Sequence, residues 1–364
     1  FSGVSQNSNR IIPICFICTK MKSNTFGLDI GATSVKLVWL DGEKDSFTYI
    51  TSSLAGVSAQ GMQSESPFDQ QEMAQLINKL VINAKIGTNN VNISLPESQV
   101  FTKVIEMPLL SEKELATAIY WEAEQYIPAP LDTMTLDWSI LKRPKEATVD
   151  QKMQVLLVAA PLKLVNRYQS ILQLAGLTIT SVETEILSII RGIVGKGPSP
   201  TRLILSIGAM NSCLAIVQNG NIVFNYVVPL GGVAFTRAIM ADFGFTVTQA
   251  EEYKKVYGLS DKNFGGKIAK AIEPILTSIL TEVKKAIAFY NEKYKGESAI
   301  SQILLTGGSA NLPGIGVYFA QNIGVETVIG NPWEMLKIQK VPPEVLKRGS
   351  EYTVAIGLAV KEYE

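Results

Sequence analysis

Phe26-Gly-Leu-Asp-Ile-Gly-Ala-Thr-Ser-Val-Lys-Leu-Val-Trp-Leu40 places a polar turn between two apolar runs, which predicts two strands joined by a tight turn. Asp29 ends the first strand, where a carboxylate has no packing role, and Gly31 lets a ligand approach bare backbone. Successive turn amides form a cradle for an anion, and Lys36 is close enough in sequence to reach it. The stretch therefore predicts a phosphate site with a hydrated divalent cation at Asp29. A plain hairpin with Asp29 exposed at its turn is the alternative.

The second half of the chain repeats this stretch without gaps. Leu203-Ile-Leu-Ser-Ile-Gly-Ala-Met-Asn-Ser-Cys-Leu-Ala-Ile-Val217 has the same Ile-Gly-Ala turn, and each copy is followed by a second glycine turn and a third apolar strand. A meander used twice predicts two similar lobes that face each other over a cleft. The copies differ at one chemically important position, because Ser206 stands where the first copy has Asp29.

The composition excludes several classes of function. The 364 residues contain no histidine, which removes histidine bases, triads and metal ligands. Lysine plus arginine equal aspartate plus glutamate at 33 each, without a basic cluster, so we expect no nucleic acid partner. Three cysteines, an odd number, favour a reducing cytoplasm over a disulfide framework. No apolar run approaches the roughly 20 residues that span a bilayer.

The sequence Gly195-Lys-Gly-Pro-Ser-Pro200 is the clearest linker in the chain. We therefore expect a first lobe over residues 21–198 and a second lobe over residues 199–364. Residues 1–20 read as a disordered extension ahead of the natural start. Within the first lobe, a strand, a helix, two strands and a helix predict an α+β insert over about 91–175.

Two capping boxes mark helix starts. Ser111-Glu-Lys-Glu114 predicts a helix that runs to Tyr126, and Thr248-Gln-Ala-Glu251 predicts a helix that begins near Glu251. In that second helix, Glu251 and Lys254 lie one turn apart on one face, although a solvated charged face is an equally simple explanation.

Two glycine motifs follow in the second half. Gly307-Gly-Ser-Ala-Asn-Leu-Pro-Gly314 comes between an apolar strand and a helix, so its amides and the helix N-terminus offer a site for an anion or a nucleotide. It has neither the Walker lysine nor the dinucleotide spacing. Pro229-Leu-Gly-Gly232 is a weaker signal of the same kind. Either segment alone also fits an ordinary turn.

Together, in this order, the motifs resemble the phosphate-one, phosphate-two and adenosine motifs of the actin-like ATPase superfamily. The position of the insert resembles the FtsA branch, and four segments resemble the PilM family of type IV pilus assembly proteins: Phe26–Gly31, Tyr120–Pro128, Pro229–Gly232 and Ala355–Ala359. The resemblance implies a two-lobed α/β fold with duplicated ribonuclease-H-like subdomains and an α+β insert in the first lobe.

The resemblance also implies ATP and Mg2+ between the lobes. Asp29 would hold the metal through water, and Glu185, in the first turn of a helix, corresponds to the acidic residue that orients attacking water; a favourable charge at a helix N-terminus explains Glu185 equally well. Glu252 with Lys255 is the alternative to Glu251 with Lys254. The residues expected at the nucleotide are Gly31, Ala32, Thr33, Ser34, Lys36, Ser206, Gly208, Gly231, Gly232, Glu251, Lys254, Gly307, Gly308 and Ser309.

Ser206 departs from the family pattern, which has aspartate on the phosphate-two strand. Serine can still hydrogen-bond a phosphate, but hydrolysis depends on the placement of metal and water. We therefore expect ATP binding with slow or absent turnover.

The function implied by the resemblance is that of a cytoplasmic adaptor of the pilus assembly platform. Such a protein binds the cytoplasmic N-terminal peptide of a PilN-like single-span protein, works with other platform proteins, and lies at the inner face of the membrane through its partner. In the insert, Trp121, Tyr126 and Ile127 suit an apolar peptide groove, although core packing explains them as well.

Two other functions fit the same superfamily. A cell-division tether of FtsA type needs an amphipathic C-terminal helix after a linker, whereas only Lys-Glu-Tyr-Glu follows Val360. A small-molecule kinase needs a catalytic base in a polar substrate pocket, which the insert does not suggest.

Overall fold

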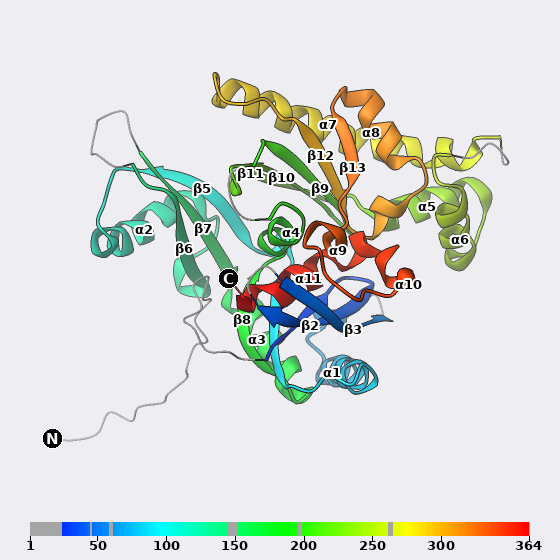
Figure 1. Cartoon of the computed structure of the whole chain (residues 1–364), viewed down its shortest axis with the longest axis horizontal. Helices are drawn as coiled ribbons and strands as arrows, with labels where there is room; N and C mark the ends of the chain where they lie inside the picture. The colour runs from blue at the N-terminus through cyan, green and yellow to red at the C-terminus, as the bar shows by residue number, and fades with distance from the viewer. Residues whose placement is uncertain are drawn as a thin grey trace.

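The computed structural model describes residues 24–43, 46–57, 61–144, 152–195, 199–260 and 265–363. The expected extension over 1–20 lies outside these residues. These residues form two five-stranded sheets, a three-stranded sheet and the helices around them (Figure 1). The predicted two-lobed α/β fold is confirmed.

The first sheet has the strand order β3-β2-β1-β4-β8. The first three strands form an antiparallel meander, and β4 and β8 continue parallel to β1. The helices α1 and α3 cover one face, where they pack against Phe26, Leu28 and Ile30 of β1. The bounds are β1 Phe26–Ile30, β2 Ser34–Glu43, β3 Ser46–Gly56, β4 Asn90–Leu95, β8 Thr178–Thr184, α1 Pro67–Asn83 and α3 Leu162–Leu174.

The second sheet, β11-β10-β9-β12-β13, repeats this order and these directions. Side chains along β9 point alternately to the two faces of this sheet. Leu203, Leu205 and Ile207 pack under α5, α6, α7 and α8, whereas Ile204 points to the opposite face. The sequence repeat is thus a structural duplication. The bounds are β9 Arg202–Ile207, β10 Ser212–Gln218, β11 Asn221–Val228, β12 Gln302–Thr306, β13 Glu326–Ile329, α5 Gly232–Phe243, α6 Val247–Tyr257, α7 Lys267–Lys293 and α8 Ile315–Ile323.

The insert is smaller than its predicted bounds of about 91–175. It consists of the antiparallel sheet β5-β7-β6 and helix α2. β4 pairs with β1, and α3 packs against α1, so both elements belong to the sheet and core of the first lobe. The bounds are β5 Phe101–Met107, α2 Glu112–Tyr126, β6 Met134–Lys142 and β7 Met153–Pro161.

The two lobes are also not separated cleanly at the expected boundary between residues 198 and 199. Helix α4 (Glu185–Ile193), from the first half, packs on the second sheet beside Ile204 and Leu304. Helix α11 (Thr353–Val360), from the second half, packs on β2 beside Val38. The two halves therefore exchange helices, which cross in the middle of the molecule (Figure 1). The short helices α9 (Pro332–Met335) and α10 (Pro343–Leu346) precede α11.

Candidate functional site

The first turn, Gly31–Ser34, is closed by a hydrogen bond from the Gly31 amide to the Ser34 carbonyl at 3.0 Å. Ala32 and Thr33 are exposed at its tip. Asp29, only 5% exposed, accepts a hydrogen bond from Lys36 at 3.0 Å between Nζ and Oδ2. Asp29 and Lys36 face each other because β1 and β2 pair at these two positions. The predicted carboxylate, turn and ammonium are thus brought together.

The second turn reproduces the first. The Gly208 amide donates to the Asn211 carbonyl at 3.0 Å, the counterpart of the bond between Gly31 and Ser34. Ser206 lies on β9 two residues before its glycine, as Asp29 lies on β1, and pairs in register with Thr306 of β12. Asp29 and Ser206 therefore occupy equivalent positions in two equivalent sheets.

The segment before α5 packs tightly on this second turn. The Gly232 amide donates to the Gly208 carbonyl and the Val233 amide to the Ala209 carbonyl, both at 2.9 Å. A Cβ on Gly231 would lie 2.6 Å from the Gly208 oxygen, so the close approach of the two segments requires glycine. Because the Gly232 and Val233 amides bond to the second turn, the start of α5 supports this turn directly.

Lys254 holds the same segment from the other side. Its ammonium is buried and donates to the Gly232 carbonyl at 3.1 Å, to the Thr236 hydroxyl at 2.8 Å and to Glu251 Oε1 at 2.5 Å. Burial lowers the pKa of Lys254. Burial opposes ionisation of Glu251, but hydrogen bonds from Lys254 and Thr236 lower its pKa. The pair expected at the nucleoside thus also joins α6 to α5.

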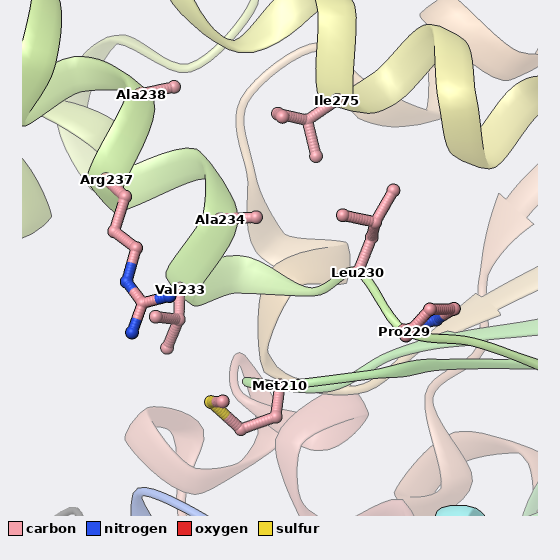
Figure 2. A pocket seen from close by; sticks show the side chains of 8 residues that line it. All are labelled: Met210, Pro229, Leu230, Val233, Ala234, Arg237, Ala238 and Ile275. Atoms are coloured by element: carbon pink, nitrogen blue, oxygen red, sulfur yellow. The ribbon is translucent and has the colours of Figure 1, made fainter.

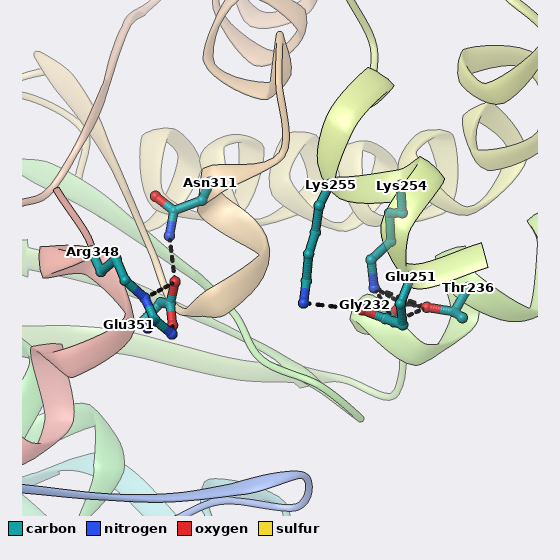
Figure 3. A network of polar contacts seen from close by, with 8 residues as sticks. All are labelled: Gly232, Thr236, Glu251, Lys254, Lys255, Asn311, Arg348 and Glu351. Atoms are coloured by element: carbon teal, nitrogen blue, oxygen red, sulfur yellow. Dashed lines mark hydrogen bonds and ion pairs between the residues drawn. The ribbon is translucent and has the colours of Figure 1, made fainter. Parts of the chain in front are cut away.

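Lys255, from the alternative pair, is the more accessible of the two lysines. Its side chain is 76% exposed and reaches Glu251 only at 4.0 Å. Figure 3 shows Lys255 and the Lys254 cluster on one side of the view, with Asn311, Arg348 and Glu351 on the other. Lys255 is therefore free to turn toward a ligand, whereas Lys254 is fixed by its internal contacts.

Gly307, Gly308 and Ser309 are the last of the second-lobe residues expected at the nucleotide. Gly307 has a φ of +84°, and a Cβ there would lie 2.6 Å from the Ile207 oxygen. A Cβ on Gly308 would meet no atom within 4 Å. Ser309 Oγ lies 2.5 Å from the position of a Cβ on Gly232, so the two glycine motifs meet.

A polar group of Asn311, Arg348 and Glu351 follows the motif that contains Gly308 and was not expected from the sequence. Arg348 pairs with Glu351 through Nη2 and Oε2 at 2.6 Å, and Asn311 Nδ2 donates to Glu351 Oε1 at 3.3 Å (Figure 3). Asn311 falls inside the motif Gly307–Gly314, which was its only sequence signal. Arg348 and Glu351 lie in short helical turns without the periodicity that identifies a helix.

Glu185 begins α4 and lies close to the first turn. Burial and the nearby carboxylate of Asp29 raise its pKa to about 8. The Glu97 amide donates to Glu185 Oε2 at 3.2 Å. Glu97 is itself only 4% exposed, and burial raises its pKa. The structure thus groups Asp29, Lys36 and Glu185 and adds Glu97, which the sequence analysis did not identify.

The insert residues expected in a groove have different surroundings. Trp121 is 65% exposed on α2, Ile127 is buried in the insert core, and Lys103 Nζ lies 3.9 Å from the centroid of the Tyr126 ring. Only Trp121 is freely available to a partner.

A cavity of about 400 Å³ lies beside the second turn (Figure 2). Met210, Leu230, Val233 and Ile275 give it an apolar wall, and Arg237 lies at its edge. None of the residues expected at the nucleotide lines this cavity.

The architecture defines the class of protein: the fold is that of the actin-like ATPases. Residues 27–363 match the family model described as type IV pilus assembly protein PilM, and the chain belongs to this family. None of the helices in the described residues has both the length and the apolar character needed to cross a membrane.

Three similar proteins illustrate the relationship. The solved PilM-PilN type IV pilus biogenesis complex contains a chain with 26% identity and a TM-score of 0.82, covering 94% of this chain and 100% of that one. The cell division protein FtsA of Streptococcus pneumoniae is 22% identical over 338 residues, 82% of this chain and 73% of FtsA. MreB5 of Spiroplasma citri bound to AMPPNP has 14% identity and a TM-score of 0.51, covering 92% of this chain and 94% of MreB5.

Proposed function

We propose that this chain is an ATP-binding adaptor of the type IV pilus assembly platform and not primarily an enzyme. The observation that carries the proposal is the pair of matching turns, Gly31–Ser34 and Gly208–Asn211, on equivalent strands of a PilM family member. A similar solved chain is in complex with PilN. The partner would accordingly be the cytoplasmic N-terminal peptide of a PilN-like protein, which would hold the chain at the inner face of the membrane.

The residues present fit magnesium and ATP. A buried carboxylate (Asp29), an ammonium (Lys36) and an exposed turn tip offer the oxygen ligand, positive charge and backbone donors that a metal-bound phosphate needs. A Cβ on Gly308 would meet no atom within 4 Å, which leaves room for the nucleoside. Asp29 would hold the metal through water, and Ser206, Gly208 and the residues around Gly308 would bind the rest of the nucleotide.

Bound magnesium would neutralise phosphate charge and help to position an attacking water. This chain supplies one carboxylate, Asp29, at the two equivalent positions, because the second is Ser206. Glu185 would carry a proton at neutral pH in the absence of ligand, since its pKa is about 8. Both features disfavour hydrolysis, and we expect turnover below about 1 per second, the lower end of the range for active kinases.

Calorimetry tests the nucleotide site, and peptide capture tests the partner. Titration with magnesium-ATP should release heat with one site per chain, whereas the absence of heat would overturn nucleotide binding. A synthetic peptide from the cytoplasmic start of the PilN-like protein should retain the chain on beads, and a scrambled peptide should not. Steady phosphate release at 1 per second or faster would contradict the adaptor assignment.

The family match over nearly the whole chain favours this function over a cell-division tether or a small-molecule kinase. A tether would pellet with anionic vesicles in the absence of any partner peptide, and the adaptor would not.

A further inference from the structure

The 3-10 turn Glu97–Gln99 (η2) lies at the junction of three parts of the molecule. It follows β4 of the first lobe and leads through Val100 into β5, the first strand of the insert. Any displacement of this turn is therefore transmitted along the backbone into the insert.

Two hydrogen bonds tie η2 to the second lobe. Asn211 Nδ2, in the second turn (Gly208–Asn211), donates to Ser98 Oγ at 3.1 Å. Asn225 Nδ2, on β11, donates to Glu97 Oε1 at 3.2 Å. A change in the relative position of the two lobes must break or shift both bonds.

The same turn also contacts Glu185, the residue expected to orient the attacking water. The Glu97 amide donates to Glu185 Oε2 at 3.2 Å, and the Ile186 amide and the Thr184 hydroxyl lower the pKa of the Glu97 carboxyl against the effect of burial. The hydroxyl of Thr102, on β5, acts on the carboxyl in the same way. The turn η2 is thus bonded to Glu185 of α4 and to Asn211 and Asn225 of the second lobe, and it continues into the insert.

Apolar packing strengthens this connection. Val104 of β5 and Leu156 and Val158 of β7 pack in one cluster with Cys213 and Val217 of the second sheet. Packed interfaces of this kind switch between discrete arrangements and do not deform continuously. The insert is therefore in contact with both lobes and would respond to their relative position.

We propose that η2 couples nucleotide binding to the insert, with Glu97 and Ser98 as positioning residues. Binding at the two phosphate turns would fix the lobes, hold Asn211 and Asn225 against η2, and thereby order β5 and its neighbours. This inference rests on the proposed function, because it regulates the same nucleotide site. By reciprocity, whatever binds the insert changes the affinity for nucleotide by the same factor.

Hydrogen–deuterium exchange tests the coupling in the full chain. Saturating magnesium-ATP should slow exchange in β5 by roughly fivefold, at the lower end of typical coupling factors. The double variant S98A/N225A should lose this protection and keep its nucleotide affinity within about threefold. The milder S98A should lose part of it, which keeps the test valid if the double variant folds poorly.

The matched control N166A/S170A changes the same residue types on the exposed side of α3, where Ser170 bonds only within its helix. It should keep the full nucleotide-dependent protection. Calorimetric binding without any change in β5, or equal protection in S98A/N225A and wild type, would overturn the coupling alone. No binding of magnesium-ATP by wild type would overturn the proposed function as well.

Discussion

Asp29 owes its position to the alternation of side chains along β1. Leu28 and Ile30 point into the first core under α1 and α3, so Gly27 and Asp29 point to the opposite face. Gly27 meets α11 so closely that a Cβ would lie 2.1 Å from the Ala355 oxygen. The carboxylate is therefore held at the end of a strand that is clamped on both faces.

The variant Asp29→Asn should weaken ATP binding specifically in the presence of magnesium. It removes the negative charge that would attract the hydrated metal, so we expect affinity with magnesium to fall by roughly tenfold, or about 1.4 kcal/mol. Calorimetry with and without EDTA measures this. Asp41→Asn, at an exposed position of β2, is the control and should bind like wild type. Equal losses with and without magnesium would argue against a metal role for Asp29.

Glu185 predicts an unusual dependence of stability on pH. Its pKa rises from 4.5 to about 8 in the folded chain, so the folded state retains a proton that the unfolded state releases. Stability from this group therefore falls as the pH rises from 4.5 to 8. Glu185→Gln should be more stable than wild type by about 4 kcal/mol at pH 8 and by less than about 1 kcal/mol at pH 5.

Urea unfolding of the nucleotide-free chain at the two pH values measures this difference. Glu124→Gln, on the exposed face of α2, should behave like wild type at both. A Glu185→Gln variant with the same pH dependence as wild type would contradict the raised pKa.

The position of Lys254 followed from the sequence, but its role did not. Helical spacing correctly placed Glu251 and Lys254 on one face. Their other partners, Thr236 and the Gly232 carbonyl, belong to α5 and become neighbours only when α5 packs against α6. Local spacing predicts neighbours within a helix and contains no information on contacts between helices.

Helix starts show both the strength and the limit of local patterns. The capping box at Ser111 is confirmed, with reciprocal bonds to Glu114. The box proposed at Thr248 is wrong, because Thr246 caps α6 with Gln249 as its partner. The two patterns overlap in Thr246-Val-Thr-Gln-Ala-Glu251, and tertiary contacts decide between them, since Glu251 bonds to Thr236 and Lys254.

The sequence also left the pairing of some strands undetermined. Repeated meanders predicted the two sheets, but β4 has the same apolar character as the insert strands. Its pairing with β1 and β8 assigns it to the first lobe, and pairing over such separations is not encoded in the strand itself.

The crossing of α4 and α11 depends on Gly357. A Cβ there would lie 1.9 Å from the Ser188 carbonyl oxygen, so the helices must move apart if the residue is enlarged. We expect Gly357→Ala to lower the free energy of unfolding by about 2–3 kcal/mol in urea titrations. The control is Gly316→Ala in α8, where the nearest atom lies at 3.9 Å and alanine should be neutral or stabilising by up to about 1 kcal/mol. Equal midpoints for the two variants would exclude a tight crossing.

At the scale of the whole molecule, a buried ion cluster joins the exchanged helices. Glu183, at the end of β8, forms ion pairs with Arg191 of α4 at 2.6 Å and with Lys361, just after α11, at 2.9 Å. Arg191 also donates to the Gly357 carbonyl at 2.9 Å. The middle of the chain and its last residues thus meet at one fully buried carboxylate.

The variant Glu183→Gln should therefore weaken the molecule as a whole. It removes the buried negative charge that faces both Arg191 and Lys361, and breaking a buried ion pair typically costs about 3–5 kcal/mol. Burial opposes ionisation of Glu183, but the two cations hold its pKa at about 2, below its ordinary value of 4.5. Its stabilising contribution is thus complete above pH 4.5 and is lost as the pH falls toward 2. The gap between wild type and Glu183→Gln in urea unfolding should narrow over this interval, whereas Glu282→Gln, in an exposed pair with Lys285, should cost at most about 0.5 kcal/mol. A gap that stayed constant from pH 6 to pH 3 would show that the charge of Glu183 does not hold the halves together.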